Sequence, residues 1–115
     1  MTKHEYSGWT NYETWNVKLW MDNEQASQEA WNDRARRIRA GVTKTKEPSA
    51  TTEQEHQEAL WLLAEQLEEH YDREADYWLE SAPPCCFSDL LLASLRQVNW
   101  KEIAEHLLED VHVEA

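Results

Sequence analysis

The chain has 115 residues with 11 basic and 23 acidic side chains, which gives a formal net charge of -12 at pH 7. This length suits a single domain over residues 1–115, and seven tryptophans supply enough apolar surface for a packed core. The negative field repels phosphate, so direct binding of nucleic acid is disfavoured and a partner with a basic surface is favoured. The same charge also suits a protein that only has to stay dissolved in a crowded cytoplasm.

No apolar run approaches the roughly 20 residues that a membrane-spanning helix requires, and the first residues are polar with no signal-peptide pattern. The two cysteines, Cys85 and Cys86, are adjacent, so they predict neither a disulfide framework nor a zinc site. No arginine or lysine lies close to them in sequence to lower a thiol pKa. We therefore expect a cytoplasmic protein that does not contact membranes and holds no metal or cofactor.

The spacing of apolar residues predicts helices throughout. Only two glycines and three prolines interrupt the chain, and no alternating strand pattern occurs. The predicted fold class is all-α, a compact antiparallel bundle of about five helices joined by short connections. The predicted helices run from Asn11 to Asp22, Glu24 to Ala40, Thr52 to Glu80, Ser88 to Arg96 and Trp100 to Val111, with a polar linker over 42–51.

The first predicted helix is unusually apolar. Thr10 and Glu13 form a T-x-x-E capping box at its start. Its apolar side chains sweep about 240° of the helix surface and leave only a strip of Thr14, Lys18 and Asp22. Such a helix either lies at the centre of the core or divides its apolar surface between the core and an interface, and we expect the central position. The spare apolar surface also allows homo-oligomers to form through this helix.

Capping signals mark the ends of the other helices. They are Asn23 and Gly41 for the second helix, Thr52 with Glu55 and then Pro83 for the third, and Asn99 with Glu102 for the last. Apolar stripes at helical spacing predict the core, and the fourth helix is rich in leucine. The longest stripe, on the third helix, comprises Leu60, Leu63, Ala64, Leu67, Tyr71, Ala75 and Trp78.

Charge is segregated along the chain. Eleven acidic residues and a single base, Arg73, lie between Glu47 and Glu80. Six of the acids fall within an arc of about 80° on the third helix and form a stripe about 33 Å long. Duplex DNA carries one charge per about 1.7 Å of axis, so this stripe is too sparse to imitate it unless the acidic face of the last helix lies alongside. The predicted partner-binding acids are Glu58, Glu65, Glu69, Asp72, Asp76, Glu80, Glu102, Glu105 and Glu109.

A basic segment supports an alternative function. Between Arg34 and Lys46 there are six basic residues and no acidic one. With a nearby tryptophan, this segment would grip phosphates and stack a base in a small nucleic-acid-binding or regulatory module. The arginines point in several directions around their helix, so they cannot all face one ligand; they would otherwise pair with the acidic stripe on a solvated surface. The candidate set is Trp31, Arg34, Arg36, Arg37, Arg39, Lys44 and Lys46.

Signatures of metal binding and catalysis are weak. Glu53-x-x-His56 is half of a di-iron motif that needs a second copy and two further glutamates. No nucleophile elbow, phosphate loop or H-E-x-x-H pattern occurs, so we expect no catalytic residues, no metal site and no enzyme activity. Trp20 and Trp31 are the best candidates for exposed interface anchors, although the core is the favoured place for every tryptophan.

Two stretches resemble a known family. G-W-T-N-Y-E-T-W-N-V-K-L-W-M-D-N-E, from Gly8 to Glu24, is similar to the opening of small proteins encoded by phages, plasmids and their bacterial or archaeal hosts. Those proteins often carry a C-terminal segment like D-L-L-L-A-S-L-R-Q-V-N-W-K-E-I-A-E-H-L-L-E-D, here Asp89 to Asp110. The family has no established activity, so the resemblance implies a mobile-element setting and not a mechanism.

The leading hypothesis is an acidic interaction protein from a phage or other mobile element. It would present acidic helices to a basic site on a host nucleic-acid-binding protein, such as a defence nuclease or a CRISPR complex. In this hypothesis the protein acts as an anti-CRISPR or anti-restriction inhibitor with partial DNA mimicry.

Overall fold

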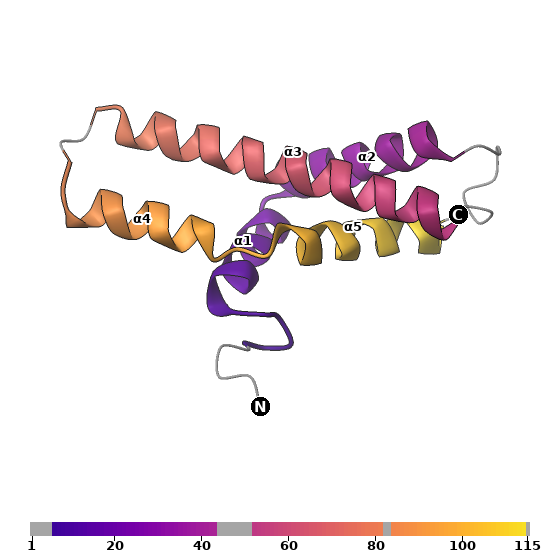
Figure 1. Cartoon of the computed structure of the whole chain (residues 1–115), viewed down its shortest axis with the longest axis horizontal. Helices are drawn as coiled ribbons and strands as arrows, with labels where there is room; N and C mark the ends of the chain where they lie inside the picture. Colours follow the sequence, from indigo (N-terminus) through magenta and orange to yellow (C-terminus); the bar gives the residue numbers. More distant parts are fainter. Residues whose placement is uncertain (1–5, 44–51, 82–83, 115) are drawn as a thin grey trace.

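The computed structural model describes residues 6–43, 52–81 and 84–114, with side chains described as far as Val111. All five predicted helices are present, and they form an antiparallel all-α bundle, as predicted (Figure 1). Within these ranges the only β structure is an isolated bridge between Tyr6 and Trp9. The helices are α1 (Tyr12–Asn23), α2 (Gln25–Val42), α3 (Glu53–Leu79), α4 (Cys86–Arg96) and α5 (Trp100–Glu114).

Helices α2, α3 and α5 enclose the hydrophobic core. α3 has 27 residues, about 40 Å at 1.5 Å per residue, and runs along most of the 50 Å length of the molecule. α2 and α5 lie against its N-terminal half, while α4 follows its C-terminal half, so that α4 and α5 lie end to end along α3 (Figure 1). The largest fully buried apolar side chains are Met21, Leu63, Leu67, Ile103, Leu107 and Leu108.

α1 turns its polar strip toward the core, so the prediction of a central helix is wrong. Thr14 is fully buried, and Lys18 is 9% exposed with its ammonium 2.7 Å from the Asp22 carboxylate. On the other side, Trp20 is 61% exposed and Tyr12 is 51% exposed. The amphipathic pattern shows which side of α1 is polar. It does not show that the start of α5 offers a hydrogen-bond donor, the N–H of Asn99, to that polar side. The apolar surface of α1 is thus divided between the core, where Met21 is buried, and solvent.

A tight turn precedes α1 and places aromatic rings on two sides of the chain. Gly8 has a φ of 87°, a left-handed conformation that glycine adopts without strain. The ring of Tyr6 lies 4.7 Å from that of Trp15 on the outer side of α1. The ring of Trp9 lies 4.2 Å from that of His106, so the turn also attaches the start of the described chain to α5.

A reciprocal hydrogen-bond network joins the N-termini of α1 and α5. The Oδ1 of Asn11 accepts from the backbone N–H of Thr14 at 2.9 Å and from the Thr14 hydroxyl at 2.6 Å. The Thr14 Oγ1 accepts in turn from the backbone N–H of Asn99 at 2.8 Å. Asn99 Oδ1 accepts from the N–H of Glu102, whose Oε1 accepts from the N–H of Thr10 at 3.0 Å. These residues, Thr10, Asn11, Thr14, Asn99 and Glu102, are named the capping clasp.

Two predicted helix starts differ in the structure. The capping box of Thr10 with Glu13 is wrong, because Asn11 is the N-cap of α1. Asn23 is not the N-cap of α2, since α1 continues through it, and Glu24 takes that position without a side-chain hydrogen bond. α1 and α2 are therefore joined by a single residue, which forms a sharp corner.

The third helix starts as predicted, but the second does not end as predicted. Thr52 and Glu55 form both hydrogen bonds of a capping box at the start of α3. Gly41 is not the stop signal of α2, because the helix continues through it. Thr43 ends the helix instead, and both its N–H and its hydroxyl donate to the carbonyl of Arg39, at 3.1 and 2.7 Å.

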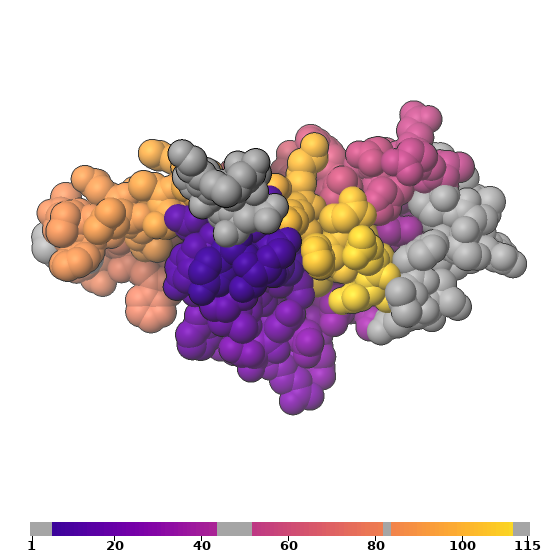
Figure 2. All heavy atoms as spheres, turned by 90° about the horizontal axis from the view of Figure 1, so that it is seen from below, coloured from indigo at the N-terminus to yellow at the C-terminus, as the bar shows by residue number. Residues whose placement is uncertain are grey.

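Beyond the core, the C-terminal half of α3 and α4 form a two-helix arm. None of the α4 residues is buried, and Phe87 and Leu90 are 75% and 60% exposed. Trp78 continues the core stripe of α3 but is 70% exposed, so its predicted core position is wrong. Beyond Ala75, α3 runs beside α4 (Figure 1), and α4 does not cover the side of α3 that carries Trp78. In Figure 2 the arm projects beyond the part of the molecule that α1, α2 and α5 form.

Replacing Thr14 with valine keeps the shape of the side chain but leaves the N–H of Asn99 and the Oδ1 of Asn11 short of a partner. We expect Thr14→Val to lower the free energy of unfolding by about 1–3 kcal/mol, measured by urea denaturation. Thr10→Val is the control, because the Thr10 hydroxyl accepts one surface hydrogen bond, from Asn99 Nδ2 at 3.2 Å. It should lose less than about 1 kcal/mol. Equal losses of unfolding free energy from the two variants would contradict a special role for the buried Thr14 hydroxyl.

Candidate functional site

The acidic stripe of α3 is exposed along its whole length. Within the described chain, its only ion pair joins Glu69 to Arg73, 3.7 Å apart. The spacing of three, four and seven residues keeps these carboxylates on one side of the helix, so their solvation follows from the helix geometry. The stripe comprises Glu58, Glu65, Glu69, Asp72, Asp76 and Glu80, all of them exposed.

The predicted acids of α5 do not extend this stripe as a free surface. Glu105 Oε1 lies 2.8 Å from His56 Nε2, and His56 Nδ1 lies 3.2 Å from a guanidinium nitrogen of Arg39. Glu102 belongs to the capping clasp. Glu109 is exposed. Two of these three carboxylates therefore hold helices together.

The predicted basic set does not form one surface. Arg39 is 4% exposed and Trp31 is 6% exposed, so neither can reach a phosphate or a base from outside. A guanidinium N–H of Arg39 donates to the carbonyl of Leu108 at 3.5 Å. Burial lowers the pKa of the Arg39 guanidinium, and the Glu105 carboxylate opposes this shift. Arg39 is thus a packing residue between α2, α3 and α5.

The remaining members of the basic set point in different directions. The guanidinium of Arg34 lies 5.2 Å above the ring of Trp31 and donates to Gln66 Oε1 at 3.1 Å. Arg37 is paired with Asp33 one turn earlier on the same helix. Arg36 is exposed, whereas Lys44 and Lys46 lie outside the described residues.

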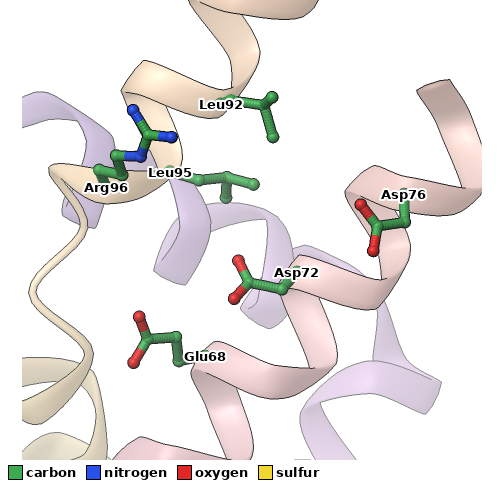
Figure 3. Close-up of a pocket in the computed structure, with 6 residues that line it drawn as sticks. All are labelled: Glu68, Asp72, Asp76, Leu92, Leu95 and Arg96. Carbon is green, nitrogen blue, oxygen red and sulfur yellow. The ribbon is translucent and has the colours of Figure 1, made fainter.

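An acidic groove of about 370 Å³ lies between α3 and α4. Figure 3 shows the carboxylates of Glu68, Asp72 and Asp76 turned toward α4, and Leu92 and Leu95 turned toward α3. Arg96 lines the α4 side. One wall is therefore acidic, and the other combines two leucines with an arginine. Part of the predicted stripe faces this groove, and Glu68 joins it although it lies outside the predicted arc.

A second cavity, of about 330 Å³, lies between the α1–α2 corner and α3. The predicted anchors Trp20 and Trp31 both line it, the first exposed and the second buried. Tyr71, His70 and two carboxylates, Glu24 and Glu74, also line it. This cavity, whose polar and aromatic lining residues are Trp20, Glu24, Trp31, His70, Tyr71 and Glu74, is named the aromatic cleft.

The electrostatics of the aromatic cleft are visible in Tyr71. Its ring stacks on Trp100 with centroids 5.3 Å apart, which fixes the phenol at the inner wall. Burial, together with the negative charges of Glu74 and Glu24, raises the pKa of Tyr71 to about 12. Both carboxylates therefore act on the same hydroxyl, one from the α1–α2 corner and the other from α3.

The two cysteines are free and exposed at the start of α4. The sequence offered no basic neighbour, but the helix supplies another cause. The backbone N–H groups of Ser88 and Phe87 stabilise the thiolate and lower the pKa of Cys85. The start of α4 therefore favours the thiolate form of Cys85.

The described residues contain no group of three or more histidine, cysteine, aspartate or glutamate side chains that could hold a metal ion. His56, part of the half di-iron motif, contacts Glu105 and Arg39 instead. None of the described helices is long and apolar enough to cross a membrane.

Sequence reasoning missed the carboxylates of the aromatic cleft. Glu74 follows Tyr71 by three residues and Leu67 by seven, so it has the spacing of the apolar stripe of α3, but its side chain is exposed. An acid with the spacing of the apolar stripe was the available signal. Glu24 gave no such signal, because its place depends on the sharp corner between α1 and α2.

Comparison with known proteins identifies a family whose function is unknown. The model of a family of unknown function, DUF7249, matches residues 2–111, and the chain belongs to this family. No curated protein and no solved structure matches it. The surfaces described above therefore carry the functional interpretation.

The pKa of Tyr71 offers a direct test of the cleft geometry. A raised pKa means that the folded protein keeps a proton that the unfolded chain releases above about pH 10, so stability falls as pH rises from 10 toward 12. We expect Glu74→Gln to lower the pKa of Tyr71, followed by NMR of the tyrosine ring carbons. Glu65→Gln, which removes the same charge from the stripe, should leave it unchanged. An identical response to both changes would place Glu74 outside the cleft.

Proposed function

We propose that this DUF7249 protein is an interaction module that binds a basic surface of another protein through the acidic stripe and groove. The observation that carries the proposal is the exposed stripe, because three arginines of α2 contact other residues. Arg34, Arg37 and Arg39 instead contact Gln66, Asp33 and His56. Unpaired surface charge of one sign speeds association with an oppositely charged partner and helps to select it.

The groove supports a partner that is both basic and apolar. Its acidic wall suits lysine or arginine side chains, while Leu92 and Leu95 offer apolar contact. Exposed Trp78 and Phe87 on the same arm are large anchors of the kind that dominate binding energy at protein interfaces. A basic amphipathic helix or loop combines these features.

The finer form of the proposal places the protein in a phage or other mobile element. The partner would then be a nucleic-acid-binding defence protein in the host cytoplasm, inhibited in the manner of an anti-CRISPR or anti-restriction protein. Support comes from the acidic surface and from the resemblance of the two motif stretches. Imitation of duplex DNA gains less support, because Glu102 and Glu105 are occupied within the fold. Self-association through the outer side of α1 stays a prediction.

Neutralising the groove tests the proposal. Immobilised protein should retain basic nucleic-acid-binding proteins from bacterial lysate at low salt and release them at high salt. Asp72→Asn/Asp76→Asn should reduce the retained amount by about fivefold, because each lost charge pair contributes up to about 1 kcal/mol.

The matched control is Glu29→Gln/Asp110→Asn, which removes two exposed charges away from the groove. It should change retention by less than about twofold. Absence of basic proteins at low salt, or equal losses from the two double variants, contradicts the proposal.

A further inference from the structure

The aromatic cleft combines two features that suit one kind of ligand. Trp20 presents a largely exposed indole ring at the mouth, and Tyr71 and Trp31 form the inner walls. Glu24 approaches from the corner between α1 and α2, and Glu74 approaches from α3. His70 also lines the cleft, with its ring 5.3 Å from that of Trp31, and no lysine or arginine occurs among the described lining residues. The cleft therefore offers ring faces and two carboxylates, with one histidine as the basic side chain among them.

We infer that the aromatic cleft receives the guanidinium group of an arginine side chain from a protein partner. This inference rests on the proposed function, since the same basic partner would supply the arginine. A guanidinium stacks flat on an aromatic face and donates paired N–H groups to carboxylates. Trp20 provides the face, and Glu24 and Glu74 provide the acceptors.

Other occupants fit less well. A phosphate or carboxylate group would meet two like charges. A purely apolar side chain would desolvate Glu24 and Glu74 without giving them hydrogen bonds. Lysine carries a compact, strongly hydrated charge and stacks poorly, so it would use the carboxylates but gain less from the rings.

Two observations within the molecule agree with this chemistry. The guanidinium of Arg34 lies 5.2 Å from the ring centroid of Trp31, so an indole of this site already contacts an arginine. Burial and the negative charges of Glu74 and Glu24 raise the pKa of the Tyr71 phenol, which agrees with a negative field at the inner wall.

Binding of short labelled peptides tests the inference. The peptides are identical except that their basic positions hold arginine in one and lysine in the other, and binding is followed by fluorescence anisotropy at low salt. The arginine peptide should bind about fivefold more tightly than the lysine peptide. Trp20→Ala and Glu24→Gln/Glu74→Gln should each weaken it by about tenfold.

Matched controls are available for both changes. Trp61→Ala removes another exposed indole from α3, and Glu58→Gln/Glu65→Gln removes two charges from the stripe. Each should change arginine-peptide binding by less than about threefold. Glu24 makes no capping hydrogen bond and Trp20 is 61% exposed, so neither change removes a buried contact that the fold requires.

The outcomes separate this inference from the proposed function. Equal weakening by both glutamine pairs, no preference for arginine, or no peptide binding would each overturn the arginine site. Retention of basic proteins that depends on Asp72 and Asp76 would still stand in those cases. The converse result is that binding of the arginine peptide depends on Trp20, Glu24 and Glu74, while Asp72→Asn/Asp76→Asn leaves the retention of basic proteins unchanged. That result would support the arginine site in the cleft and contradict the proposed binding by the groove.

Discussion

The buried hydroxyl of Thr14 fixes how the start of α1 meets the start of α5. It donates to Asn11 and accepts from the backbone N–H of Asn99, so both of its roles are used inside the protein. A buried hydroxyl without such partners would cost about 1–3 kcal/mol, and the free N–H groups at the start of α5 need acceptors as well. One arrangement of α1 on α5 satisfies both requirements, and in it the polar strip of α1 faces inward.

This arrangement produces the surfaces that bear on function. With Thr14 and Lys18 facing the core, Trp20 must lie on the outer side of α1, beside the corner that leads into α2. That corner stands over α3 and forms the mouth of the aromatic cleft. The clasp also draws its residues from both motif stretches, Gly8 to Glu24 and Asp89 to Asp110. These segments therefore have a structural role in holding each other, in addition to any contact with a partner.

Local features of the fold could be predicted from sequence, whereas features set by distant contacts could not. The Thr52–Glu55 capping box formed as predicted because all its atoms belong to one helix turn. The exposure of Trp78 depends on where α4 lies, and the inward position of Lys18 depends on the clasp. Neither the exposure of Trp78 nor the inward position of Lys18 can be predicted from the periodicity of a single helix.

The candidate site shows the same division. The stripe on α3 was predictable because helix geometry alone aligns its acids. The withdrawal of Glu105 into a contact with His56 was not, because these residues are 49 positions apart. The aromatic cleft needs three helices to assemble, so only Glu74, an acid with the spacing of the apolar stripe of α3, hinted at it.

Hydrogen exchange at the backbone amide of Asn99 tests the clasp most directly. This amide precedes α5 and donates to the Thr14 side chain rather than to a backbone carbonyl. If the clasp orders the fold, the amide should exchange as slowly as the core amides of α5, through global unfolding. Exchange at the rate of an unstructured amide would contradict the account.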